Sequence, residues 1–138
     1  MANRTATILG TVFLLVGILG FVIPNLGGAH FSVAHNLVHI ISGAVALWLG
    51  LKGSPQAAKT FCIVFGAVYL LLGVAGFVAG ADASPSTGIP HGNDTKMLKV
   101  IPGQLELGTM DHIIHVLMGG IFLIGGFATR TVGARRTA

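Results

Sequence analysis

The chain has 138 residues, a formal net charge of +4 and only 9% charged residues, against about 25% in soluble proteins. So little charge cannot cover the surface of a soluble domain, and 53% of the residues are hydrophobic. A single cysteine, Cys62, excludes an internal disulfide and a cysteine-based zinc site. The composition, with 21 glycines and no collagen-like period, is typical of a multi-pass membrane protein.

Four apolar segments are long enough to cross a hydrocarbon core of about 30 Å as helices. They cover residues 5–23, 33–51, 59–80 and 110–130. Because the backbone must satisfy its own hydrogen bonds in lipid, we predict an all-α fold, an integral membrane four-helix bundle that forms a single domain over residues 1–138. The first segment follows Arg4 as a secretory signal would, but its length and the repeat described below favour a retained helix.

The outer loop, residues 81–109, joins the third and fourth segments. Its first half contains SPSTGIPHGNDT, which is rich in Pro, Gly, Ser and Thr. Its second half, MLKVIPGQLELGT, carries enough Leu, Val and Ile to fold back onto the helices. We therefore expect an ordered cap near residues 97–107, after a mobile tip in which His91 is solvated.

The charges indicate an orientation. One side holds six basic residues: Arg4, Lys52, Lys59, Arg130, Arg135 and Arg136. The other side holds two lysines and every acidic residue: Lys96, Lys99, Asp82, Asp94, Glu106 and Asp111. The positive-inside rule then places both termini in the cytoplasm and the protein in the cell (inner) membrane. No basic patch interleaved with exposed aromatic residues indicates nucleic-acid binding.

The sequence repeats itself. Residues 10–22, GTVFLLVGILGFV, match residues 66–78, GAVYLLLGVAGFV, at eight of thirteen positions. HIISGAVAL from His39 aligns more loosely with HVLMGGIFL from His115. The offset is 56 in the first match and 76 in the second, so the second outer loop is about twenty residues longer. We predict a tandem duplicated helix pair, a parallel repeat with a pseudo-twofold axis along the membrane normal.

Each apolar segment carries two glycines seven residues apart, which is two helical turns. The pairs are Gly10 and Gly17, Gly43 and Gly50, Gly66 and Gly73, and Gly119 and Gly126. Small residues on one face let transmembrane helices approach closely, so we interpret these glycines as packing seams. The alternative is a flat wall against a planar cofactor.

Histidines cluster at the outer ends of the second and fourth segments. His35 and His39 are four residues apart, as are Asp111 and His115, so each pair lies on one helix face. His112 lies three residues before His115 and can share its face. If the second and fourth helices meet, these side chains converge, with His39 and His115 about 8 Å below the outer helix ends.

Three interpretations of the cluster stay open. Neutral imidazoles and Asp111 form a structural hydrogen-bonded lock between two helices. Alternatively His35, His39, Asp111, His112 and His115 bind a divalent metal, or His39 and His115 bind a haem b as axial ligands. The third interpretation is a small transporter or proton relay. The first and third segments have no charged residue in mid-membrane, which argues against it. We expect no catalysis, because nucleophile motifs, phosphate loops and the many histidines of a di-iron hydroxylase are missing.

The chain resembles a bacterial four-helix membrane family known as domain of unknown function 4383. The resemblance rests on LLVGILGF at residues 14–21, on HNLVH with His35, Asn36, His39 and Gly43, and on Asp111, His112, Ile114 and His115. The sequence departs from the family pattern by carrying His112 where Asn is usual. The resemblance implies fold and membrane location and brings no activity.

We therefore expect a non-catalytic scaffold or accessory subunit with a structural His/Asp cluster near the outer face. Its expected partners are the lipid bilayer and, beyond that, other membrane protein subunits or further copies of the chain. Nucleic acid is not among them.

Overall fold

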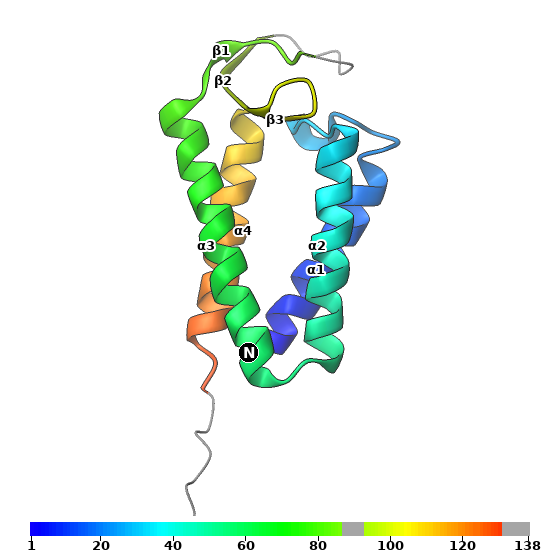
Figure 1. The fold of residues 1–138 in the computed structure, drawn as a ribbon, viewed down its shortest axis with the longest axis vertical. Helices are drawn as coiled ribbons and strands as arrows, with labels where there is room; N and C mark the ends of the chain where they lie inside the picture. Colours follow the sequence, from blue (N-terminus) through cyan, green and yellow to red (C-terminus); the bar gives the residue numbers. More distant parts are fainter. Residues whose placement is uncertain (87–92, 131–138) are drawn as a thin grey trace, which may run out of the picture.

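Four long helices make up most of the protein. The computed structural model describes residues 1–86 and 93–130, so His91, Arg135 and Arg136 lie outside the described residues. The helices are α1 (Ala2–Leu19), α2 (Val33–Lys52), α3 (Pro55–Ala79) and α4 (Thr109–Phe127), with a short helix η1 (Leu26–Gly28) before α2 (Figure 1). All four are long and apolar enough to cross a membrane.

The helix ends differ from the predicted ones where capping residues intervene. α1 ends at Leu19 instead of residue 23, and residues 20–22 continue as turns toward Pro24. α3 begins at Pro55 instead of residue 59, because Ser54 accepts a hydrogen bond from the Ala57 amide and proline suits the first helical position. α4 runs over 109–127, three residues short of the predicted end, and α2 extends one residue beyond its predicted end.

The helices pack as two antiparallel hairpins, α1 with α2 and α3 with α4. In the first hairpin a Cβ added to Gly10 would lie 2.6 Å from the Leu47 amide nitrogen and 2.9 Å from the Gly43 carbonyl oxygen. Backbone therefore touches backbone along this seam. The predicted role of the glycines in helix packing is confirmed.

The second hairpin repeats these contacts at equivalent positions. A Cβ added to Gly66 would lie 2.9 Å from both the Gly119 carbonyl oxygen and the Leu123 amide nitrogen. Gly66 is the counterpart of Gly10 by the offset of 56, and Gly119 and Leu123 are the counterparts of Gly43 and Leu47 by the offset of 76. The two hairpins thus use one packing pattern.

Aromatic side chains fill the space between the hairpins. The Phe13 ring lies 5.2 Å from the ring of Tyr69 and 5.8 Å from that of Phe122, measured between centroids. Phe65 packs at a tilt against Tyr69 at 4.6 Å, and Phe61 stacks on Phe65 at 4.9 Å. This cluster forms the core that joins the two hairpins over their middle turns.

A small antiparallel sheet covers one end of the helices. Its strands are β1 (Ala81–Ala83), β2 (Asp94–Ile101) and β3 (Leu105–Leu107), in that order. The prediction of an all-α fold is therefore wrong in this loop, although the expected ordered cap is present and begins earlier. The β-branched residues of β2, followed by a turn with Gly103 at φ 75°, favour a hairpin over a helix.

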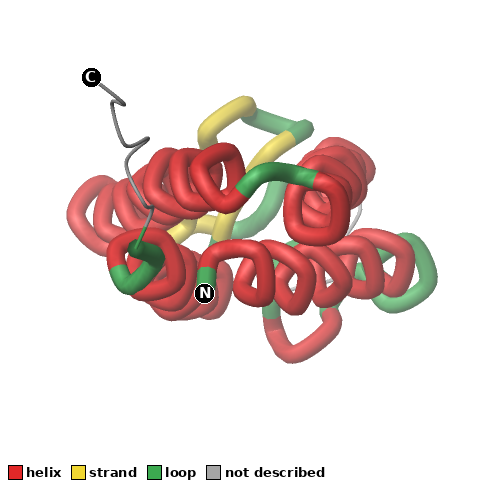
Figure 2. The backbone as a smooth tube through the Cα atoms, turned by 90° about the horizontal axis from the view of Figure 1, so that it is seen from below, coloured by secondary structure: helices red, strands yellow, loops and turns green. Residues whose placement is uncertain are grey.

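We call the end of the molecule that carries this sheet the cap end. The N-terminus lies at the opposite end (Figure 1). Figure 2 views the helices from the N-terminal end, with the strands at the far end. The histidines of α2 and α4 therefore lie beside the sheet, at the first turns of both helices.

Candidate functional site: a histidine cavity at the cap end

The link between α1 and α2 turns sharply and then enters the protein. Gly27 and Gly28 have φ values of 64° and 83°, which only glycine adopts without strain. His30 and Phe31 follow and are buried. Ser32 then caps α2, because its hydroxyl accepts a hydrogen bond from the His35 amide at 3.1 Å. The same hydroxyl donates to the carbonyl of Gln104 in the cap.

The backbone of His30 is held from both hairpins. Its amide donates to Oδ2 of Asp111 at 3.0 Å, and its carbonyl oxygen lies 2.7 Å from Nδ1 of His35. Asp111 Oδ2 also accepts from the Gly108 amide at 2.8 Å and so caps α4. The link before α2 is thus tied to α4 and to α2 by buried hydrogen bonds. Sequence reasoning missed His30, because loop residues show no helical periodicity.

The hydrogen bonds fix the tautomers of the histidine pair on α2. A carbonyl oxygen only accepts, so Nδ1 of neutral His35 carries the proton and its Nε2 holds a lone pair. Nε2 of His39, which lies 3.0 Å away, must then donate to His35 Nε2. The two rings stack at 4.6 Å between centroids. One proton thus points from His39 to His35 and the next from His35 to the His30 carbonyl.

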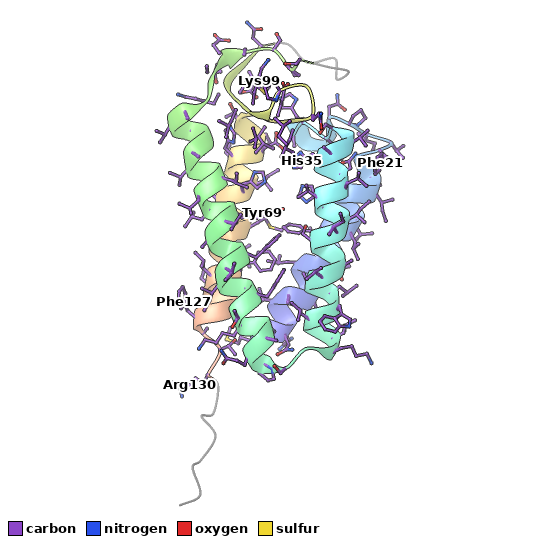
Figure 3. All side chains as sticks on the ribbon, viewed as in Figure 1. Phe21, His35, Tyr69, Lys99, Phe127 and Arg130 are labelled. Carbon is purple, nitrogen blue, oxygen red and sulfur yellow. The ribbon has the colours of Figure 1, made fainter. Side chains whose placement is uncertain are left out.

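His115 lies across the same space, and its Nδ1 has no hydrogen-bond partner among the described residues. Its ring centroid is 6.1 Å from that of His35 and 4.8 Å from that of Tyr69. Nδ1 of His39 likewise has no partner among the described residues. Figure 3 shows His35 near the cap end and Tyr69 reaching from α3 toward α2.

These side chains line one cavity of about 280 Å³. Four of the five residues predicted as ligands contribute to it: His35, His39, Asp111 and His115. The remaining wall is apolar and comes from α1, the link and α4: Val12, Phe13, Val16, Leu26, Gly27, Phe31, Ile114 and Met118. The structure therefore brings the predicted cluster together, even though α2 packs mainly on α1 and α4 mainly on α3.

His112 lies apart from this cavity. Its Nε2 is 2.7 Å from the carbonyl oxygen of Lys96 in β2, and its ring packs into the space left by Gly76 and edge-on against Phe77. One residue turns a helix by about 100°, so a neighbour of Asp111 points toward α3 instead. His112 therefore joins α4 to the cap and does not share the face of His115.

Within the part of the chain that the structure describes, no three His, Cys, Asp or Glu side chains are placed to hold a metal ion. Oδ2 of Asp111 and both ring nitrogens of His35 already have protein partners. His39 and His115 retain unpartnered nitrogens. Metal or haem ligation by these residues stays a prediction.

Comparison with known proteins supports the resemblance. The model of the family described as domain of unknown function (DUF4383) matches residues 3–110. The chain belongs to this family. The matched residues contain the first three helices and the cap, including the motif around His35 and His39. They end just before Asp111, so the motif that opens α4 lies beyond the DUF4383 match. No curated protein and no solved structure matches the chain.

Two carboxylates, half-buried Asp94 and buried Glu106, hold the cap of this DUF4383 chain together. Asp94 accepts from the Thr109 amide and hydroxyl at 2.9 and 2.5 Å, and from the Lys96 amide at 2.9 Å. Glu106 accepts from the amides of Ser86 and Gly103 at 2.6 and 2.8 Å. Burial acts to raise the pKa of both carboxyls, but these hydrogen bonds outweigh it, so each pKa lies below its ordinary value.

The cap is expected to loosen in acid. A carboxyl whose pKa is lowered by folding stabilises the fold above its unfolded pKa, and this contribution is lost as the pH falls below about 4. As the pH is lowered from about 5 to about 3, hydrogen exchange of the Thr109 amide should accelerate, after correction for the intrinsic exchange rate. Asp94→Asn should remove most of that dependence, and Asp82→Asn on exposed β1 should keep it. If the Thr109 amide of the unsubstituted protein were equally protected from exchange at both pH values, the role of Asp94 in holding the cap would be contradicted.

Proposed function

We propose that this protein is a multi-pass component of the cell membrane, with both termini in the cytoplasm and the cap outside. The distribution of charge supports this orientation. Four described basic residues lie at the end opposite the cap: Arg4, Lys52, Lys59 and Arg130. All acidic residues lie at the cap end. The positive-inside rule favours the basic end in the cytoplasm.

The two hairpins are proposed to be copies that arose by tandem duplication, related by a pseudo-twofold axis along the membrane normal. The matching contacts of Gly10 and Gly66 support this relation. A further pair of contacts does so as well. Asn36 packs into the space left by Gly20, and His112, its counterpart, packs into the space left by Gly76. Parallel repeats of this kind are common in membrane proteins.

Its proposed role is that of a non-catalytic scaffold or accessory subunit whose polar cluster locks the hairpins at the outer face. One observation carries this proposal, namely that the His30 backbone is bound by Asp111 of the second hairpin and His35 of the first. Such hydrogen bonds contribute only about 0.6–2 kcal/mol each within a membrane, but they fix register. The apolar outer faces of the helices are left to lipid or to partner subunits.

A double-mutant cycle tests the lock. His35→Phe and Asp111→Leu, made singly and together, should be non-additive in the free energy of unfolding by about 1 kcal/mol, because both act through the His30 backbone. Reversible denaturation in mixed micelles or bilayers gives the four values. Thr11→Ala, which removes an exposed hydroxyl bond to the Thr7 carbonyl of the same helix, is the control and should be additive with Asp111→Leu. Additivity of His35→Phe and Asp111→Leu within about 0.3 kcal/mol would contradict the lock.

A metal site is the second candidate, and one contact favours it. A histidine that binds metal usually donates its other ring N–H to a carbonyl or carboxylate, as His35 does to the His30 carbonyl. A metal at Nε2 of His35 would take the place of the His39 N–H that now lies there. The cavity lies below the usual range of roughly 300–1,000 Å³ for ligand sites, which favours an ion over a haem. Stoichiometric metal in gently extracted protein, lost in His39→Ala, would support this candidate, and a Soret band would identify haem instead.

A transport role has less support. α1 carries no charged residue after Arg4, and α3 carries none after Lys59. The polar cluster therefore has no continuation toward the opposite end along these helices. A relay of protons needs partners through the full thickness of the membrane.

A further inference from the structure

The histidine cavity opens along the line where the two hairpins meet. Val12 of α1 and Ile114 of α4 both line it, and each keeps 38% of its surface exposed. These two helices belong to different hairpins and face the surroundings with apolar side chains. In the proposed membrane, the cavity is thus reached from the lipid phase near the outer interface.

The interior of the cavity offers hydrogen-bonding atoms that the described part of the protein does not use. Nδ1 of His115 and Nδ1 of His39 have no hydrogen-bond partner among the described residues, and each side chain is 5% exposed. Buried polar atoms without partners are costly, so a bound molecule that hydrogen-bonds His115 gains affinity from satisfying them. A neutral imidazole supplies one donor and one acceptor, and either nitrogen takes either role.

Charge restricts the class of ligand. No Lys or Arg is among the described residues that line the cavity, so an anionic lipid head group would find no counter-charge. Asp111 spends its Oδ2 on two backbone amides, and no described group of three side chains is placed to hold a cation. A neutral ligand with a small polar head fits these walls best.

Size and shape narrow the class further. A volume of about 280 Å³ holds one substituted six-membered ring and little more. Phe13 and Phe31 line the cavity beside the imidazoles. Phe31 stacks on His35 at 5.2 Å between centroids, and Phe13 meets His39 in a T-shaped contact at 5.1 Å. Aromatic walls with one hydrogen-bonding edge suit a planar ring. A hydrocarbon chain attached to the ring can leave between Val12 and Ile114 into lipid.

We propose that this cavity binds the head group of a prenyl quinone or its quinol, with His115 hydrogen-bonded to a ring oxygen. A quinone oxygen accepts from a protonated ring nitrogen, whereas a quinol hydroxyl donates to a lone pair, so the same residue serves both forms. The proposal rests on the membrane location proposed above. It is independent of the structural lock, which uses other atoms.

Tyr69 provides a local probe for binding. It is the only tyrosine, and its ring lies 4.8 Å from that of His115. Trp48 is the only tryptophan, so Tyr69 dominates the fluorescence of the protein in a Trp48→Phe background. Decylubiquinone titrated into nanodiscs containing this variant should quench Tyr69 emission with saturation. His115→Phe should weaken the apparent affinity at least about ten-fold, which corresponds to one hydrogen bond to a buried group.

Two further variants separate binding from partition into lipid. Val12→Phe narrows the opening without touching a polar atom and should also weaken binding, so the test survives if His115→Phe fails to fold. Ile8→Phe, on the same helix but outside the cavity, should leave the affinity unchanged. Quenching that rises linearly with quinone content, or equal affinity in all variants, would overturn the proposal. Competition by decanol as strong as that by decylubiquinol would overturn the assignment of a ring. If the double-mutant cycle for His35 and Asp111 were additive, the lock would be contradicted, but the quinone proposal would not be affected.

Discussion

Replacing Gly119 by Ala is expected to lower the free energy of unfolding by about 2–3 kcal/mol, a large loss for a single methyl group. The new Cβ would lie 2.6 Å from the Leu70 amide nitrogen and 2.8 Å from the Gly66 carbonyl oxygen. Both neighbours are backbone atoms of α3, which cannot rotate away as a side chain can. The two helices of the second hairpin must therefore separate or shift along each other.

Gly120 provides a matched control for this substitution. A Cβ at Gly120 meets nothing within 4 Å, so Gly120→Ala should be neutral or slightly stabilising, since alanine favours helices by up to about 1 kcal/mol over glycine. Both variants add one methyl group to adjacent positions of α4. Reversible unfolding in micelles, followed by far-ultraviolet circular dichroism, measures the difference. Equal stability of the two variants would show that the α3–α4 seam is not closely packed.

Asp111→Leu is expected to destabilise the protein by roughly 2–5 kcal/mol, because two buried amides lose their acceptor together. Oδ2 of Asp111 binds the amides of His30 and Gly108, which belong to segments far apart in the sequence. Leucine has a similar size and accepts no hydrogen bond. Hydrogen exchange should therefore accelerate at both amides, in addition to the fall in global stability.

Asp111→Asn separates acceptance of hydrogen bonds from charge. The asparagine oxygen can still accept from both amides, so this variant should recover at least half of the loss seen in Asp111→Leu. Asp82→Leu on exposed β1 controls for the loss of an acidic residue at the cap end and should change stability little. If Asp111→Asn is as unstable as Asp111→Leu, the carboxylate charge is essential, which would favour a bound cation over the lock.

The sequence predicts the helical part of this fold because the four apolar segments leave few alternatives in lipid. Glycine spacing also predicts which faces pack, since Gly10 and Gly66 have equivalent surroundings. α1 pairs with α2 and α3 with α4, although the shortest connection, residues 53–54, joins α2 to α3. The convergence of His35 and His115 therefore depends on side chains that reach across from different hairpins. Helical periodicity predicts which residues share a face of one helix, but it does not predict the distance between His35 and His115 on different helices.

The remaining features depend on contacts with irregular segments. His30 has no periodic signal, yet its backbone connects Asp111 with His35. His112 was expected beside His115, but the carbonyl of Lys96 in β2 binds its ring instead. Both contacts involve the connecting segments at the cap end, and sequence patterns do not predict the path of such segments. The cap sheet was missed as secondary structure for the same reason.

The equivalence of Asn36 and His112 has an evolutionary consequence. Each side chain occupies the space beside a glycine of the preceding helix, but only the longer imidazole of His112 continues to a partner, the carbonyl of Lys96 in β2. That strand belongs to the stretch of about twenty residues by which the second loop exceeds the first. Under the proposed duplication, the partner of the His112 ring is present only because the second loop is longer. Descendants with a shortened loop should carry a shorter residue at position 112.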